Sequence, residues 1–145
     1  MRVVVQRVSH ASCTIDGSLS GKIDKGYLLL VGFGKDDDGS QISKMAEKIS
    51  KLRIFEDEAG KMNLDIFAVG GKILSISQFT LYADASKGNR PSFTGALAPD
   101  IATIYYDRFN EELRSLGLDV ETGVFGADMK IDLLNDGPVT ILLEM

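Results

Sequence analysis

The feature that most restricts the fold is an apolar stripe with helical periodicity between Pro99 and Gly117. Its members recur every three or four residues: Ile101, Tyr105, Phe109, Leu113 and Leu116. Proline favours the first turn of a helix and glycine its end, so we predict a helix over this segment. A second stripe follows a possible capping box of Asp38 and Gln41 and predicts a helix over about 39–52. One-sided apolar helices need a sheet to cover.

Apolar runs rich in β-branched residues predict the strands of that sheet. They cover about 2–8, 12–15, 27–33, 72–82, 120–125, 130–135 and 139–143. Asp16-Gly17 is a turn signal that folds the first strand back as a hairpin. Since 145 residues suffice for one buried core, we expect a single domain over residues 1–145. Its class is mixed α/β, α+β-like, with two helices packed on largely antiparallel sheets of about seven strands.

The chain contains one histidine and one cysteine, which excludes several chemistries. A structural zinc site takes about four Cys or His ligands and a catalytic site two or three, so we expect neither a metal nor another cofactor. The formal net charge of -5 argues against indiscriminate binding to polyanions, so any contact with nucleic acid must be local. No run approaches the roughly 20 apolar residues that span a membrane, and we expect a cytoplasmic protein.

His10 and Cys13 are poor candidates for a catalytic pair. A nucleophilic cysteine or serine normally borrows a base, and His10 is the only imidazole in the chain. In an extended segment these two residues, three positions apart, lie on opposite faces. We therefore expect Cys13 in the core and His10 on the surface.

Polar side chains gather at the end of the strand predicted over 72–82, in the run Ser77, Gln78, Phe79 and Thr80. Strand alternation directs Ser77 and Phe79 to one face and the other two to the opposite face. Side chains alone therefore do not form one pocket here. Either the run is an ordinary hydrogen-bonded strand end, or its backbone groups take part in a site.

Two further segments have the composition of a nucleotide-binding surface. Lys87 and Arg90 lie in a loop that also contains Phe93, and they form the best candidate contact for phosphate. A solvated turn explains them equally well. Phe125 and Met129 are suited to hold a flat ring between them, although core packing is the simpler explanation.

Gly137 and Pro138 mark a turn between the last two predicted strands. A trans bond is the default, because only about 5–6% of X-Pro bonds are cis. A cis bond would direct two successive carbonyl groups the same way, and such a pair can accept hydrogen bonds from an ammonium group. The local sequence does not distinguish the two forms.

Four short motifs are modest individually but specific as a set. They are S-Q-F-T-L at 77–81, K-G-N-R-P-S-F at 87–93, G-V-F-G-A-D-M at 123–129 and N-D-G-P-V-T at 135–140. In this order and spacing they resemble the D-aminoacyl-tRNA deacylase family. The segments 53–57 and 60–64 extend the resemblance, which runs from the first predicted strand to the last. Asp65 departs from the small polar residue expected at that position.

The resemblance implies a homodimeric hydrolase that cleaves the ester between a D-amino acid and the terminal adenosine of tRNA. Glycine mischarged on tRNA(Ala) is the implied second substrate, and the implied role is chirality proofreading in translation. The active sites would lie at the dimer interface. There, Gly137 and Pro138 of one subunit would enter the pocket of the other as a Gly-cis-Pro element and exclude L side chains.

The same resemblance assigns the reacting ester to the strand-end motif. Ser77 and the backbone N–H groups of Phe79 and Thr80 would position the carbonyl and stabilise the oxyanion, while Gln78 would brace the loop. The neighbouring ribose 2′-hydroxyl would assist the attack of water. Little is then required of titratable side chains.

The nucleotide-binding surface follows from the resemblance as well. Phe125 and Met129 become candidates for the adenine pocket, and Lys87 and Arg90 candidates for contacts with tRNA phosphates. With so few phosphate contacts, tRNA affinity should depend only weakly on salt.

Two other functions remain open from the residues. One is a small-metabolite esterase that uses Thr80 or Ser77 as a covalent nucleophile, which Thr80→Val would inactivate. The other is a non-catalytic dimeric adaptor, which the acidic net charge favours. An adaptor would discharge neither D-Tyr-tRNA nor L-Tyr-tRNA.

Overall fold

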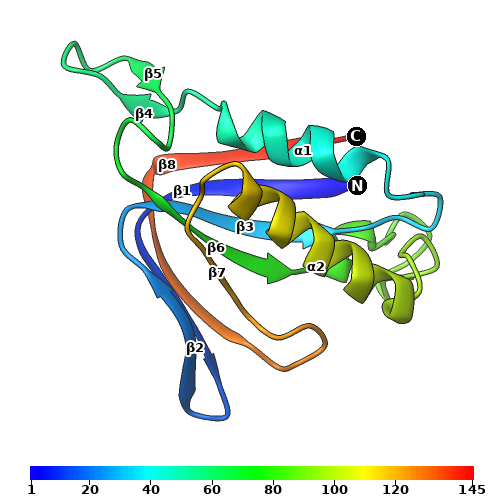
Figure 1. Cartoon of the computed structure of the whole chain (residues 1–145). Coiled ribbons are helices and arrows are strands. Elements are labelled where there is room, and N and C mark those ends of the chain that lie inside the picture. The colour runs from blue at the N-terminus through cyan, green and yellow to red at the C-terminus, as the bar shows by residue number, and fades with distance from the viewer.

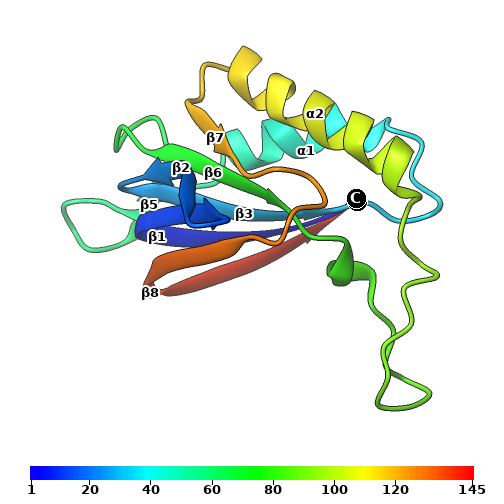
Figure 2. The same ribbon diagram turned by 90° about the horizontal axis from the view of Figure 1, so that it is seen from below.

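In the computed structural model, which describes residues 1–145, two helices cover one face of a curved mixed sheet (Figures 1 and 2). The elements in chain order are β1 (Arg2–Ile15), β2 (Ser18–Ile23), β3 (Gly26–Gly32), α1 (Gln41–Ser50), β4 (Phe55–Glu56), β5 (Met62–Leu64), β6 (Lys72–Ser77), the 3-10 helix η1 (Phe79–Tyr82), α2 (Pro99–Ser115), β7 (Val120–Thr122) and β8 (Lys130–Glu144). The large sheet has the order β2-β1-β3-β6-β7, and β8 pairs with β1. The mixed α/β class is the one expected.

Parallel pairing is more extensive than the sequence predicted. β1 is antiparallel to β2, β3 and β8, but the pairs β3–β6 and β6–β7 are parallel. Each parallel pair is joined through a helix, α1 or α2, because parallel neighbours need a long crossover. The strand count was also wrong in detail. The segments 2–8 and 12–15 form one strand, the last two predicted strands merge into β8, and the β4–β5 hairpin was missed.

Helix α2 forms where predicted, and the middle of its predicted apolar stripe is buried. Tyr106, Phe109 and Leu113 are buried, whereas Ile101 is 41% exposed and Leu116 is 40% exposed. The stripe was therefore confirmed at Phe109 and Leu113 and wrong at its two ends, and Tyr106, which it did not include, joins the buried face. The surfaces that α2 covers, α1 and the sheet, select the buried face.

The predicted capping box before α1 is absent. The Asp38 carboxylate accepts a hydrogen bond from the Ser40 N–H at 3.0 Å, while the Gln41 side chain donates to Asp37. Hydrogen bonds from the side chain and backbone of Ser40 hold the pKa of Asp38 below its usual value. Asp38 thus stabilises the turn that enters the helix and makes no reciprocal bond with Gln41.

The core has two parts. A cluster of 22 buried residues fills the space between the helices and the sheet, and a second cluster of 7 lies on the opposite face, where β1 and β8 bend. Cys13 is fully buried in the second cluster and His10 is exposed, which confirms the expectation for both. Burial also raises the pKa of the Cys13 thiol. Neither helix combines the length and apolar character needed to cross a membrane.

Candidate functional site

A cavity of about 560 Å³ lies where the parallel strands β3 and β6 end. Of its 18 lining residues, 13 are hydrophobic. The ends of the two strands form its floor, the loop before α2 forms one wall, and residues 125–131 form another. Ligands commonly bind beyond the carboxyl ends of parallel strands, so the position and the apolar lining both indicate a binding site.

The strand-end motif enters this cavity because β6 stops at Ser77. The Gln78 N–H donates to the Val31 carbonyl at 2.7 Å, and the chain then turns into η1. Gly32 permits this approach, since a Cβ there would lie 2.9 Å from the Gln78 carbonyl oxygen. The alternation predicted through Thr80 was therefore wrong. The first N–H groups of a helical turn have no partner within that turn, so those of Phe79 and Thr80, at the start of η1, are candidates to bind a ligand.

Thr80 has no general base beside it. It is exposed and does not line the cavity, and its hydroxyl accepts a hydrogen bond from the Gln78 side chain. His10 lies on β1, 4.0 Å from Asp132. A covalent mechanism at Thr80 thus lacks the base that would activate its hydroxyl.

Aromatic rings form the walls of the cavity. Phe79 and Phe93 meet edge to face, with ring centroids 5.0 Å apart, and Phe125 packs against Tyr106 at 6.1 Å. Met129 also lines the cavity. Such a slot of aromatic and thioether groups is suited to bind a flat apolar ring.

Tyr106, which the sequence analysis did not single out, connects the cavity wall to the strand below. Its hydroxyl donates to the Ser75 carbonyl at 2.7 Å, two residues before Ser77. Burial raises the pKa of Tyr106, so the hydroxyl remains a donor. The neighbouring Ser75 Oγ and Asn110 Oδ1 are buried without a hydrogen-bond partner. Only tertiary packing distinguishes Tyr106 from the adjacent Tyr105.

Lys87 and Arg90 do not line the cavity. Both are exposed in the loop between η1 and α2, which reciprocal backbone hydrogen bonds between Asp84 and Ser92, each 2.8 Å long, close at its base. The structure therefore brings together five of the predicted residues in the cavity: Ser77, Gln78, Phe79, Phe125 and Met129. Thr80 and the two cations lie outside it.

The cis Gly137-Pro138 bond lies in a bulge of β8, and this pair does not line the cavity. Gln6 of β1 pairs with Thr140 and Val8 pairs with Asn135, so β8 advances five residues where β1 advances two. The surplus residues leave the ladder and are mostly exposed. The turn predicted between two strands is thus an excursion within one.

Arg7 anchors this bulge. Its side chain is buried and donates from Nε to the Asp136 carbonyl at 3.0 Å and from Nη1 to the Ile54 carbonyl at 2.7 Å. Gly137 has φ +132°, and a Cβ there would lie 3.0 Å from Arg7 Nη2. A planar guanidinium can bridge two carbonyls in this way, so the bulge has a fixed orientation.

The bulge and the cavity lie at opposite ends of the sheet. Val8, beside the bulge, pairs with Gly26 at the start of β3, whereas Gly32 at the end of β3 lines the cavity. Six strand steps separate Gly26 from Gly32, which corresponds to about 20 Å. In Figure 1 the bend of β8 lies at the β4–β5 end and η1 at the other end. The bulge therefore does not reach the cavity of its own chain.

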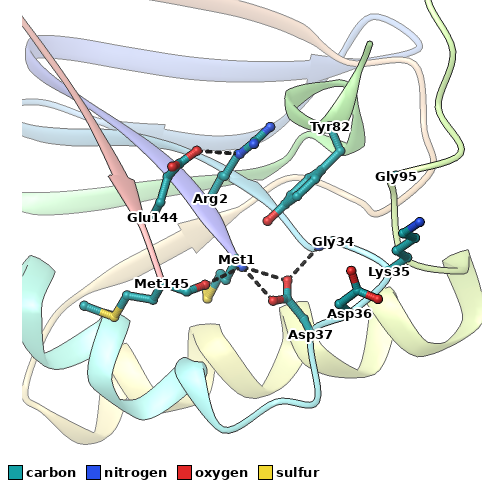
Figure 3. A pocket seen from close by; sticks show the side chains of 10 residues that line it. All are labelled: Met1, Arg2, Gly34, Lys35, Asp36, Asp37, Tyr82, Gly95, Glu144 and Met145. Atoms are coloured by element: carbon teal, nitrogen blue, oxygen red, sulfur yellow. Dashed lines mark hydrogen bonds and ion pairs between the residues drawn. The ribbon is translucent and has the colours of Figure 1, made fainter.

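A second hollow, of about 520 Å³, lies beside the ends of β1 and β8 (Figure 3). Its charged groups mostly bond one another. The Met1 amino group lies 2.7 Å from the Asp37 carboxylate and donates to the Met145 carbonyl at 2.7 Å, and Arg2 pairs with Glu144 at 2.6 Å. These pairings hold the strand ends together and leave few free polar groups for a ligand. Nowhere in the chain do three His, Cys, Asp or Glu side chains form a group that could hold a metal ion.

The sequence matches a family model described as D-Tyr-tRNA(Tyr) deacylase over residues 4–144. A D-aminoacyl-tRNA deacylase of Lactobacillus delbrueckii subsp. bulgaricus is 59% identical over 145 residues, which is 100% of both chains. One of Staphylococcus saprophyticus subsp. saprophyticus is 58% identical over 144 residues, covering 99% of this chain and 95% of the relative.

Two solved structures share the fold. One, described as c-Myc DNA Unwinding Element Binding Protein, has a TM-score of 0.93 and 40% identity and covers 100% of this chain and 99% of its own. Another, described as a probable eukaryotic D-amino acid tRNA deacylase, has a TM-score of 0.87 and 18% identity, with coverage of 99% and 98%. The second likeness concerns the fold alone. Sequence and fold thus agree over the full length.

Proposed function

This chain belongs to the D-Tyr-tRNA(Tyr) deacylase family and is a hydrolase of the aminoacyl-tRNA ester, and we propose that the reaction takes place in the cavity at the ends of β3 and β6. The supporting observation is that three separate family motifs contribute to the lining of this one cavity, through residues 77–79, Phe93, residues 125–127 and Met129. The products are a free D-amino acid and tRNA. We place this proofreading of translation in the cytoplasm.

The chemistry proposed for the cavity needs no ionisable side chain. Water attacks the ester carbonyl, the carbonyl oxygen becomes an oxyanion, and the terminal ribose oxygen leaves with a proton. The Ser77 hydroxyl and the N–H groups of Phe79 and Thr80 position the carbonyl and stabilise the oxyanion. Gln78 braces this turn through its hydrogen bond to Thr80. The ribose 2′-hydroxyl, held beside the carbonyl, assists the attacking water.

The terminal adenine is proposed to bind against Phe125 and Met129. Both line the cavity, and Phe125 is backed by the buried Tyr106. Stacking on an aromatic ring contributes about 1–3 kcal/mol per base. Lys87 and Arg90, exposed on the adjoining loop, are proposed to contact nearby phosphates.

Chiral selection is assigned to Gly137 and Pro138 of a second copy of the chain. Their carbonyl groups would accept hydrogen bonds from the substrate ammonium and leave no room for an L side chain, whereas a D side chain would point away. Glycine, which has no side chain, would escape this clash, so glycyl-tRNA(Ala) is the proposed second substrate. The separation of about 20 Å along β3 supports a homodimer, because the bulge is too far from its own cavity.

A discharge assay tests the activity. Wild-type protein should release tyrosine from D-Tyr-tRNA and glycine from Gly-tRNA(Ala), and leave L-Tyr-tRNA charged. Equal rates on D-Tyr-tRNA and L-Tyr-tRNA would refute the selection mechanism. Absence of any discharge would refute the proposed activity.

A complementation experiment tests the shared site. A cavity variant, Phe125→Ala, and a bulge variant, Gly137→Ala, each disable one half of every site. Mixed dimers then contain one intact site and one doubly impaired site. Random reassociation of equal amounts should restore about a quarter of wild-type activity, since half of the dimers are mixed and each has one of two sites intact. Activity that stays at the average of the two variants would show that each site belongs to one chain.

A further inference from the structure

A basic hollow of about 390 Å³ lies along the C-terminal half of α1, and no part of the proposed mechanism uses it. It is lined by Lys44, Glu47, Lys48, Lys51, Leu52 and Arg53. Four of these six residues are cations, in a chain whose formal net charge is -5. Their concentration at one place therefore requires an explanation other than overall composition.

The cations share one face because of helical spacing. Lys44, Lys48 and Lys51 follow one another at intervals of four and three residues, which places them in a row along α1. The first two are about 6 Å apart along the helix axis. Lys51 is paired with Glu47, at 2.5 Å, but Lys44 and Lys48 make no ion pair. The row thus offers free ammonium groups to a ligand with repeated negative charges.

Arg53 continues the row beyond the helix and is held in place. Its Nε donates to the Asn63 carbonyl at 2.8 Å, and its Nη2 donates to the Asn63 side chain. Part of the guanidinium is thereby fixed, and its other N–H groups remain available. An ordered guanidinium loses less side-chain freedom when it binds a phosphate.

The basic hollow lies at the same end of the molecule as the β8 bulge. Arg53 directly precedes Ile54, whose carbonyl accepts a hydrogen bond from Arg7 at 2.7 Å. The same guanidinium holds the Asp136 carbonyl, next to Gly137. In Figure 1 the C-terminal end of α1 points toward the β4–β5 end, where β8 bends. The basic hollow is therefore far from the cavity of its own chain.

We propose that the basic hollow binds backbone phosphates of the tRNA whose aminoacyl end occupies the cavity of the partner subunit. This inference rests on the proposed function: if the bulge of one chain enters the cavity of the other, the basic hollow of the first chain lies beside that cavity. Each tRNA would then be held by Lys87 and Arg90 of the chain that carries the cavity and by Lys44, Lys48 and Arg53 of the other, so its affinity would depend more steeply on salt than Lys87 and Arg90 alone would predict.

Acidic side chains limit where the RNA can run. Glu56, Asp57 and Glu58 follow the basic hollow in the β4–β5 hairpin and are wholly or partly exposed. Phosphates are repelled by these carboxylates and attracted by the lysine row. The RNA backbone should therefore follow α1 and avoid the hairpin.

The test compares a full tRNA with a substrate that has no further phosphates. The variant K44Q/K48Q removes two unpaired cations and keeps side-chain length, and K22Q/R108Q, on β2 and the exposed face of α2, is the control with the same change of charge. Each protein is assayed on D-Tyr-tRNA and on 3′-O-(D-tyrosyl)adenosine at several salt concentrations. Uncharged tRNA binding is measured in parallel by fluorescence anisotropy.

For K44Q/K48Q we expect kcat/KM on D-Tyr-tRNA to fall about tenfold and the salt slope to decrease by about 1.5–2, with the adenosine ester unaffected. The control should retain wild-type values. An unchanged kcat/KM and salt slope on tRNA would overturn the proposal, as would an equal loss on both substrates, which would indicate a damaged cavity. A wild-type protein that discharges no D-Tyr-tRNA would refute the proposed function instead. In that case the anisotropy measurement still tests the basic hollow: equal tRNA affinities of wild type and K44Q/K48Q would overturn the proposal that it binds tRNA phosphates.

Discussion

The two ends of the sheet differ in the chemical character of their residues. The cavity end is apolar: strand ends, four phenylalanines and a methionine surround it, and its polar groups are hydroxyl, amide and backbone groups. The bulge end is rich in cations. The buried guanidinium of Arg7 fixes the β8 bulge, and the lysine row of α1 lies at the same end of the molecule. In the proposed function, the first end binds a base and an ester, and the second orients an ammonium group and binds phosphates.

In the proposed mechanism neither end is sufficient alone. In that proposal, the cavity holds the ester but has no fixed acceptor for the substrate ammonium, and the fixed carbonyls of the bulge have no ester beside them in their own chain. Because the two ends are about 20 Å apart in one chain, a two-fold arrangement is the simplest way to combine them. The predictions below weaken one end at a time, from the largest expected effect to the smallest.

Gly137→Ala should have the largest effect, through the bulge end. The added methyl group would lie 3.0 Å from Arg7 Nη2 and 3.1 Å from the Val139 nitrogen, at a φ of +132° that L residues rarely adopt. A displacement of the carbonyls of about 1 Å is expected to lower kcat/KM on D-Tyr-tRNA by about 100-fold. Gly17→Ala is the control, because Gly17 also has a positive φ but nothing within 4 Å. Wild-type discrimination by Gly137→Ala in the discharge assay would contradict the role of the bulge.

Arg7→Lys should weaken the same end through its anchor. An ammonium group cannot bridge the Asp136 and Ile54 carbonyls as the guanidinium does, so one buried acceptor loses its partner. We expect unfolding by urea to show a loss of about 2 kcal/mol. The preference for D-Tyr-tRNA over L-Tyr-tRNA should also fall, by about tenfold. Loss of stability with full discrimination would show that Arg7 serves folding only.

Phe125→Ala tests the cavity end. Loss of the ring that is proposed to stack on adenine should raise KM for D-Tyr-tRNA by about tenfold, with kcat changed less, because stacking contributes about 1–3 kcal/mol. Phe67→Ala, which removes a half-exposed ring outside the cavity, should leave both constants unchanged. A fall in kcat at constant KM would instead assign Phe125 to the chemical step.

Thr80→Val should have the smallest effect, less than about threefold in kcat/KM, because the hydroxyl has no base beside it, the backbone N–H is retained and only the exposed hydrogen bond from Gln78 is lost. The variant replaces a hydroxyl by a methyl group of similar size. Steady-state discharge of D-Tyr-tRNA is the measurement. Complete loss of activity in a folded Thr80→Val variant would instead support the covalent mechanism at Thr80.

Local sequence patterns predicted where each helix and strand lies better than they predicted which elements lie next to one another. The periodicities placed both helices within a few residues, and the apolar runs located most strands. The burial of Tyr106 on α2, the parallel pairing of β6 and the β4–β5 hairpin were missed. Each of these depends on contacts between distant segments, which periodicity in one segment does not contain.

The candidate site shows the same division. Ser77 and Phe125 were recognised from motif order, and the structure brings them into one cavity. Tyr106 and Arg7 were missed, because a buried tyrosine and a buried arginine look ordinary in sequence. Their roles arise from acceptors far along the chain, at Ser75, Asp136 and Ile54.

The sequence by itself determined the set of motifs, the shortage of bases and metal ligands, and the periodicity of each element. Those properties depend on residue identity and on local backbone geometry. Only the tertiary structure decided that β6 ends in an apolar cavity and that β8 bulges at the opposite end of the sheet. The reason is physical: strand register and buried faces minimise the free energy of the whole chain, so no single segment specifies which distant residues will meet.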